Sequence, residues 1–277
     1  MNPNEKNRVV RFTAIQRLFH GLLIVSFLIQ GSTGLARMYI ETGWGKGLAW
    51  VFGGYEGSLA VHKYVGILLV SGFVVHLMYL LFKVNWRKFP GALFEPDSLV
   101  PHLRDIKEFF QHVGWFMGIG KAPRFDRWGY WEKFDYWAVF WGIPVLGATG
   151  LILAYSLASS RIMPGWFLNV AFWIHRIEAM LAMVHIFIIH FFIAHLRRHN
   201  FPMDRAMFEG SSRLDGIRHE KPAWIERLEK TRGLDRVLVA EARPGWRLFY
   251  YLFGYAALLF GTFLLIGGLV NSRYITW

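Results

Sequence analysis

Residues 59–82 read LAVHKYVGILLVSGFVVHLMYLLF, and this apolar run decides the fold class. Its only charged residue is Lys63. A helix needs about 20 apolar residues to cross the hydrocarbon core of a bilayer. The run is long enough, so we predict a transmembrane helix that carries two histidines, His62 and His76.

Four further stretches resemble this run in length and hydrophobicity. They extend from about Leu18 to Met38, Tyr136 to Ala158, Trp166 to Leu196 and Leu248 to Val270. Hydrophobic residues make up 54% of the 277 residues and charged residues only 18%, a balance too apolar for an ordinary soluble domain. The sequence therefore predicts an all-α, multi-pass membrane protein with five transmembrane helices.

The positions of Lys and Arg predict the orientation, because these residues collect in cytoplasmic loops. Residues 83–133 contain nine of them and residues 197–247 contain twelve. The segment before the first span adds Lys6, Arg8, Arg11 and Arg17, whereas the loops on the other side hold only Arg37, Lys46, Arg161 and Arg273. The N-terminus is therefore predicted to be cytoplasmic, and the second and fourth spans to run in the same direction.

The composition restricts the chemistry that the chain can support. There is no Cys, which excludes disulfides, cysteine-ligated iron–sulfur clusters and covalently attached c-type haem. A metal ion or haem must then be held by His, Met, carboxylate or backbone oxygen. The net charge of +12 comes with no groove-reading or base-stacking motif, so it indicates membrane topology rather than nucleic-acid binding.

Both long cytoplasmic loops contain amphipathic patterns. In the first, Asp97-Ser98 is the predicted N-cap of a helix with an apolar stripe. The stripe comprises Leu99, Leu103, Ile106, Phe109, Phe110 and Val113. We expect this helix along the membrane surface or beneath a partner protein. In the second loop, residues 224–234 have a weaker amphipathic pattern. Short helices in a solvated linker explain this pattern as well as a helix on the membrane surface does. No internal repeat is apparent.

Histidines within the spans are the candidate functional residues, because polar groups in lipid are costly and tend to be functional. His62 and His76 are fourteen residues apart, which places them within about 40° of one helix face and about 21 Å apart. His175 and His190 are fifteen residues apart, which places them within about 60° of one helix face and about 22 Å apart. Since the two spans are parallel, His62 and His175 share the outer depth, and His76 and His190 the inner depth. Pairs at two heights suit two stacked haems in a four-helix bundle.

The inner level has more imidazoles than one haem needs. His20, at the start of the first span, also lies at the inner depth, so three histidines compete there for two axial positions. His185 is expected at mid-depth, about 80° from His175, and His195 nearly opposite to His175. For His185 and His195, packing or hydrogen bonding is the favoured interpretation and iron ligation the alternative.

Several motifs match a known group of membrane cytochromes. The first two spans contribute Arg17-Leu18-Phe19-His20, Thr33-Gly34-Leu35-Ala36 and His62, and the third contributes Lys133-Phe134-Asp135 and Phe140-Trp141-Gly142. The fourth contributes His175, Glu178-Ala179 and the run from Ile186 through His190 to His195, followed by Phe201-Pro202-Met203-Asp204 and Glu209-Gly210. Over roughly residues 12–210 the chain resembles the dihaem cytochromes b of the formate dehydrogenase gamma, hydrogenase and thiosulfate reductase group.

The resemblance implies two haem b groups and their ligands. The outer haem would be held by His62 and His175, and the inner haem by His20 and His190. The additional histidines of this chain keep His76 with His190 as an alternative inner pair, and they leave room for a third haem. On this interpretation the first four spans form a haem-binding bundle.

The resemblance also implies a task for the chain. A quinone, either menaquinone or ubiquinone, would lie beside the inner haem, with Lys133 and Asp135 as candidate contacts. The partner would be a redox subunit carrying iron–sulfur, molybdenum or multihaem c centres. The chain would be the membrane-anchor cytochrome b of a respiratory oxidoreductase in the bacterial cytoplasmic (inner) membrane. Residues 1–210 would form the dihaem domain, 211–247 a cytoplasmic loop, and 248–277 the fifth helix with a short outer tail.

Two other classes of function also use intramembrane histidines. A His-lined transporter of transition metals or protons would need a polar path and an acidic mouth, which the sequence does not show. A purely structural membrane anchor would use imidazoles as polar contacts between helices. The electron-transfer subunit of a quinone-linked oxidoreductase complex is the favoured interpretation.

Overall fold

The computed structural model describes the chain except for residues 1–5, 198–199, 202, 243 and 276–277. Five helices within the described residues are long and apolar enough to cross a membrane, which confirms the predicted fold class. They are α1 (Ala14–Met38), α3 (Gly54–Lys83), α5 (Tyr130–Ala154), α7 (Gly165–Val184, prolonged by π-helical turns to Leu196) and α12 (Pro244–Val270).

Hydropathy alone predicted the starts of α1 and α5 several residues too late. α1 begins behind Thr13, which accepts a hydrogen bond from the backbone N–H of Gln16 at 3.3 Å, while the Gln16 side chain accepts from Thr13 N at 2.9 Å. At α5, the backbone N–H of Gly129 donates to Glu132 Oε2 at 2.7 Å. These helices extend beyond the apolar runs because polar groups satisfy their first turns.

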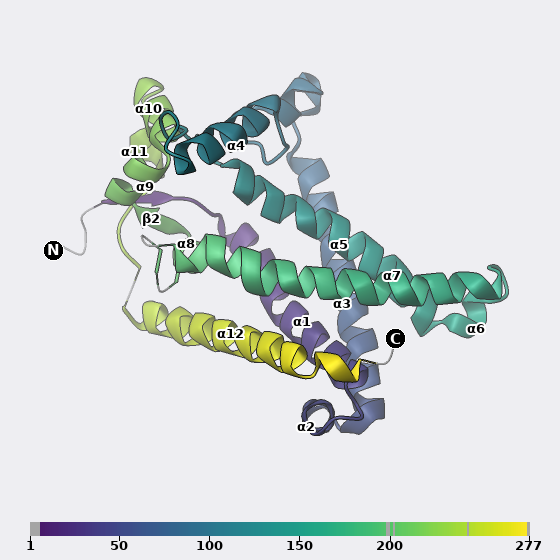
Figure 1. Cartoon of the computed structure of the whole chain (residues 1–277). Helices are drawn as coiled ribbons and strands as arrows, with labels where there is room; N and C mark the ends of the chain where they lie inside the picture. The colour runs from purple at the N-terminus through teal and green to yellow at the C-terminus, as the bar shows by residue number, and fades with distance from the viewer. Residues whose placement is uncertain (1–5, 198–199, 202, 243, 276–277) are drawn as a thin grey trace.

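The spans form two antiparallel hairpins and one added helix (Figure 1). α1 packs along α3 and α5 along α7, while α12 lies against α1 and the π-helical part of α7. The short helices α2 (Gly43–Val51) and α6 (Ser156–Ser159) lie at the turns of the hairpins, at what we call the far end. α12 also ends there, in the 3₁₀ turn η5 (Ser272–Tyr274). The opposite end, which carries the β-strands, is called the sheet end.

The sheet end has a folded cap that the sequence did not predict. β1 (Arg8–Val10) pairs antiparallel with both β2 (Ser211–Arg213) and β3 (Leu238–Val239). The cap helices are α8 (Ala206–Glu209), α9 (Leu214–Glu220), α10 (Pro222–Lys230) and α11 (Leu234–Val237). Val9, Ile217, Trp224 and Ile225 form its apolar core. Residues 211–239 of the expected cytoplasmic loop therefore fold onto the N-terminal strand, and the pattern at 224–234 lies in the short helices α10 and α11.

The connection between α3 and α5 contains the expected amphipathic helix, but the predicted N-cap is wrong. Its elements are the 3₁₀ turns η1 (Trp86–Lys88) and η2 (Gly91–Phe94) and the helix α4 (Leu103–Phe116). α4 is capped at His102, whose backbone N–H donates to Asp105 Oδ2 at 2.5 Å, and not at Asp97-Ser98. Pro101 delays the helix start, because the residue before a proline avoids the helical conformation.

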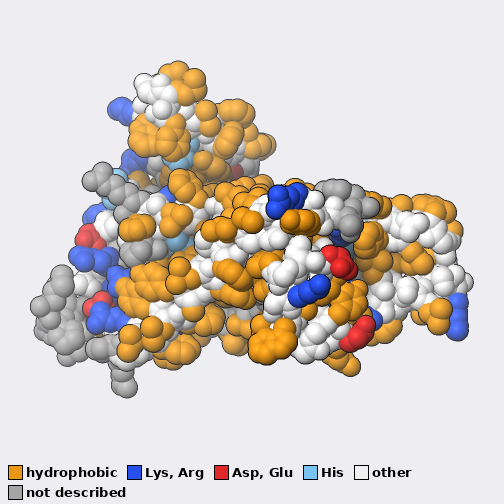
Figure 2. All heavy atoms as spheres, turned by 60° about the horizontal axis from the view of Figure 1, so that its bottom comes forward, with side chains coloured by type: hydrophobic (Ala, Val, Ile, Leu, Met, Phe, Trp, Pro, Cys, Tyr) orange, Lys and Arg blue, Asp and Glu red, His pale blue; other side chains and the backbone are white. Residues whose placement is uncertain are grey.

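The outer surface of the bundle is apolar. Hydrophobic side chains cover a large part of the face in Figure 2, and charged side chains occupy only small areas of it. Large apolar residues of the spans are exposed, such as Leu18 (74%) and Leu259 (72%). Leaving such a surface in water would cost about 25 cal/mol per Å². Lipid tails therefore cover it, and the chain is a multi-pass membrane protein.

Candidate functional site

Two pairs of histidines face each other within the bundle. Toward the far end, His62 on α3 and His175 on α7 have ring centres 6.2 Å apart. Toward the sheet end, His20 on α1 and His190 on the π-helical part of α7 have ring centres 6.3 Å apart. The structure thus brings together both pairs that the sequence resemblance implied.

A threonine contacts each ring of the far-end pair. Thr33 Oγ1 on α1 is 2.9 Å from His62 Nδ1, and Thr149 Oγ1 on α5 is 3.0 Å from His175 Nδ1. The two threonines begin the tripeptides Thr33-Gly34-Leu35 and Thr149-Gly150-Leu151. Neither contact was predicted from the sequence, although the shared tripeptide is a signal that could have revealed them.

An aspartate joins two histidines at the sheet-end pair. Asp135 Oδ2 on α5 is 3.1 Å from His190 Nδ1, and its Oδ1 is 3.1 Å from His185 Nε2. A carboxylate that accepts a hydrogen bond from a ring N–H fixes the tautomer and orientation of that imidazole. The two pairs therefore differ in chemistry: hydroxyls contact the far-end rings, and a carboxylate contacts His190.

The backbone of α7 explains why two histidines, His185 and His190, meet at Asp135. His185–His190 and Phe192–Leu196 are π-helical, so one turn takes about 4.4 residues instead of 3.6. Histidines five positions apart then lie on nearly the same side, whereas a regular α-helix would separate them by about 140°. The angle predicted between His175 and His195 assumed a regular α-helix throughout, whereas the chain is π-helical beyond Val184. Single π-helical turns occur frequently at functional sites.

Two further predicted histidines have other partners. His76 Nε2 is 3.1 Å from the Tyr136 hydroxyl, so its ring is directed to α5. His195 Nδ1 accepts the backbone N–H of Asp204 at 3.2 Å, and its ring centre is 6.0 Å from that of His190. His76 and His195 therefore make hydrogen-bonding and packing contacts.

Lys133, one of the two predicted quinone contacts, is engaged with α4. Its Nζ donates to both carboxylate oxygens of Asp105, at 2.9 and 2.8 Å. Both side chains are nearly buried, with 7% and 10% of their surface exposed. The ion pair ties α4 to the first turns of α5. Of the two predicted contacts, Asp135 is the one that touches the histidines.

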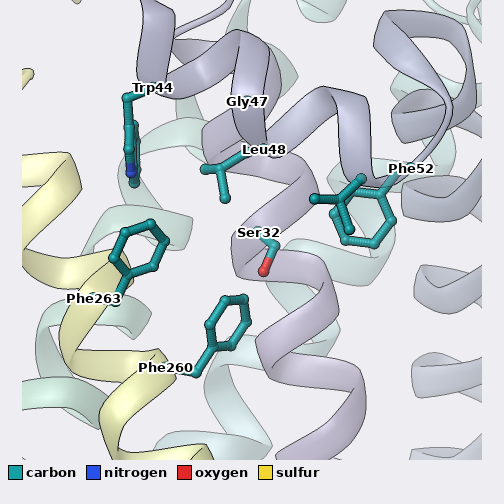
Figure 3. A pocket seen from close by; sticks show the side chains of 8 residues that line it. Ser32, Trp44, Gly47, Leu48, Phe52, Phe260 and Phe263 are labelled. Atoms are coloured by element: carbon teal, nitrogen blue, oxygen red, sulfur yellow. The ribbon is translucent and has the colours of Figure 1, made fainter.

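An apolar hollow of about 320 Å³ lies between α1, α2 and α12 near the far end. Figure 3 shows Phe260 and Phe263 of α12 on one side and Leu48 of α2 on the other, with the Ser32 hydroxyl near the middle. The lining residues are Ser32, Trp44, Gly47, Leu48, Val51, Phe52, Phe260 and Phe263. None of them is ionisable, so this hollow offers apolar space but no group for proton or metal chemistry.

The spacing of both histidine pairs fits an iron atom with two axial imidazoles. A metal lies about 2 Å from an imidazole nitrogen, which is roughly 1.15 Å from the ring centre, so two opposed ligands separate their ring centres by about 6.3 Å. Haem supplies the other four ligands itself. A bare ion needs more protein ligands, and no group of three His, Asp or Glu suited to a metal occurs in the described part of the chain.

Apolar spans with paired, half-buried histidines define a membrane cytochrome of the b class. The family model described as prokaryotic cytochrome b561 matches residues 11–210. The chain belongs to this family and is a membrane haem b electron-transfer protein. This match confirms the resemblance of the motifs to membrane cytochromes b. The search of curated proteins finds no match.

Proposed function

We propose that the chain is the dihaem membrane subunit of a respiratory oxidoreductase. It passes electrons between a quinone at the sheet end and a partner redox subunit at the far end. The observation that carries the proposal is the presence of two histidine pairs, with ring centres 6.2 and 6.3 Å apart, at two levels of one bundle. Haems held by these two pairs would connect the two membrane faces.

Each histidine pair has a defined role in this proposal. His62 and His175 are the axial ligands of the far-end haem b, and His20 and His190 are those of the sheet-end haem b. When bound, the haem supplies one-electron oxidation and reduction of its iron. The protein buries the iron between helices and orients the imidazoles through their hydrogen bonds. The contact of His76 with a tyrosine supports a role for His76 beside the haems rather than as a ligand.

The quinone, of the menaquinone or ubiquinone class, binds beside the sheet-end haem. Asp135 and His185 lie in contact there, and both are groups that can exchange a proton with a quinol. The loops at this end are the Lys- and Arg-rich ones, which supports an orientation toward the cytoplasm and a location in the inner membrane. Quinone chemistry then takes place near the cytoplasmic face.

The partner must supply the redox centres that this chain cannot hold. Iron–sulfur clusters and c-type haems need cysteines, and the chain has none. A subunit with iron–sulfur, molybdenum or multihaem c centres would exchange electrons with the His62–His175 haem. That haem is the one nearer the far end.

Haem stoichiometry tests the proposal. A pyridine haemochrome assay on the purified chain should give two protohaems per polypeptide. His62→Ala and His175→Ala should each remove the same haem, and His20→Ala should remove the other. A preparation without protohaem would refute the proposal. Removal of different haems by His62→Ala and His175→Ala would refute the pairing.

A further inference from the structure

The two threonines beside the far-end histidines share one hydrogen-bond pattern. Thr33 Oγ1 donates to the carbonyl four residues earlier at 2.7 Å, and Thr149 Oγ1 does the same at 2.6 Å. A hydroxyl has one hydrogen, so each oxygen acts as the acceptor in its second contact, to His62 Nδ1 at 2.9 Å or His175 Nδ1 at 3.0 Å. The hydrogen of that second contact therefore belongs to the imidazole.

This pattern decides which ring nitrogen is free. A neutral imidazole has one N–H, and the other nitrogen carries a lone pair. With the hydrogen on Nδ1, only Nε2 of His62 and of His175 can bind iron. The threonines thus select the tautomer that a ligand to haem iron needs.

We infer that Thr33 and Thr149 are positioning residues for the iron held by His62 and His175. Each hydroxyl keeps the hydrogen on Nδ1, holds the ring plane and makes Nε2 more basic. The inference rests on the proposed function, and it adds two helices, α1 and α5, to this haem site. Each hairpin contributes the same unit, one Thr-Gly and one His.

Burial makes these hydroxyls difficult to replace. Thr33 is 0% exposed and Thr149 8%. If Thr33 were absent, the N–H of His62 would lose this partner where water has little access, and an unpaired buried donor is costly. A bond to the helix backbone does not by itself require such burial, because Thr262 on α12 makes the same kind of bond at 2.8 Å and is exposed. Thr262 is therefore the matched control.

The test uses Thr33→Val and Thr149→Val, which remove the hydroxyl and keep the branched shape. Two properties of the His62–His175 haem are measured on the purified full chain: its rate of loss to excess apomyoglobin and its midpoint potential. Each variant should lose this haem roughly 10- to 100-fold faster, which is the usual effect of removing such a partner. The potential should rise, because a less basic imidazole stabilises ferric iron less.

Three comparisons separate this effect from a general loss of structure. The His20–His190 haem should keep its wild-type loss rate and potential in both valine variants. Thr33→Ser and Thr149→Ser, which retain a hydroxyl, should behave like the wild type. Thr262→Val should change neither haem. If a valine variant retains no haem at all, the serine variant decides: an unchanged potential supports the inference, and a shifted one contradicts it.

An unchanged loss rate and potential in the Thr33→Val/Thr149→Val double variant would overturn the inference. Equal effects of valine and serine would overturn it as well, because the hydroxyl would then be irrelevant. Failure of the proposed function has a different signature. In that case the wild type contains no protohaem, or His62→Ala leaves both haems in place, whatever the threonine variants do.

Discussion

Gly150→Ala tests how closely α5 approaches the ring of His175. A Cβ at position 150 would lie 3.1 Å from His175 Cε1 and 3.6 Å from its Nδ1. The equivalent glycine of the other hairpin, Gly34, leaves more room, because a Cβ there would lie 3.6 Å from His62 Cε1. The first distance forces the ring to move, and the second is an ordinary van der Waals contact. Gly34→Ala is thus the matched control.

The cost should fall on the haem-bound state. Iron fixes the ring of His175 in place, whereas an unligated ring can turn away from the added methyl group. Overpacking of this kind costs about 1–3 kcal/mol, which corresponds to roughly 5- to 150-fold in haem affinity. Alanine also favours a helix over glycine by about 1 kcal/mol, but both variants gain this equally. The ratio between them isolates the clash.

Haem loss to apomyoglobin measures this ratio. Gly150→Ala should release the His62–His175 haem faster than Gly34→Ala by the factor above, and the His20–His190 haem should be unaffected in both. Equal release from the two variants would refute the close approach of α5 to His175. So would faster release from Gly34→Ala.

Three further predictions concern the sheet end. Asp135→Asn removes the charge beside His190, so the potential of the sheet-end haem should rise by on the order of 60 mV in a redox titration, the one-electron equivalent of a tenfold change; a shift of the far-end haem instead would contradict the assignment. Asp105→Asn leaves the buried Lys133 ammonium unpaired and should cost about 3–5 kcal/mol of stability. The control Glu95→Gln, which removes the exposed ion pair with Lys88, should cost less than about 1 kcal/mol. Similar unfolding midpoints for the two variants would contradict this prediction. Burial lowers the pKa of Lys221, so the unfolded chain binds more protons than the folded chain at alkaline pH, and stability should rise as the pH increases toward the ordinary lysine pKa of about 10.4; thermal unfolding of Lys221→Met should lack this part of the rise.

The limits of sequence-based prediction are clear at α7. Spacing on a regular helix placed His175 and His190 at two levels of the bundle, because the chain between them is α-helical as far as Val184 and only its last part is π-helical. The same spacing takes no account of the π-helical turns after Val184, which change the rotation per residue on the way to His195. Apolar residues surround such a span on every side, so its sequence gives no amphipathic pattern that would report the rotation.

The amino-acid sequence by itself determined the five spans and the depths of the histidines, because the thickness of the hydrocarbon core sets both helix length and axial position. Only the tertiary structure decided which side chain meets which ring. Thr33 reaches His62 across 29 positions and Arg8 reaches Ser211 across 203. The physical reason is that the rotation of a span and the pairing of two- or three-residue strands depend on packing between distant segments, which no local pattern of hydrophobicity records.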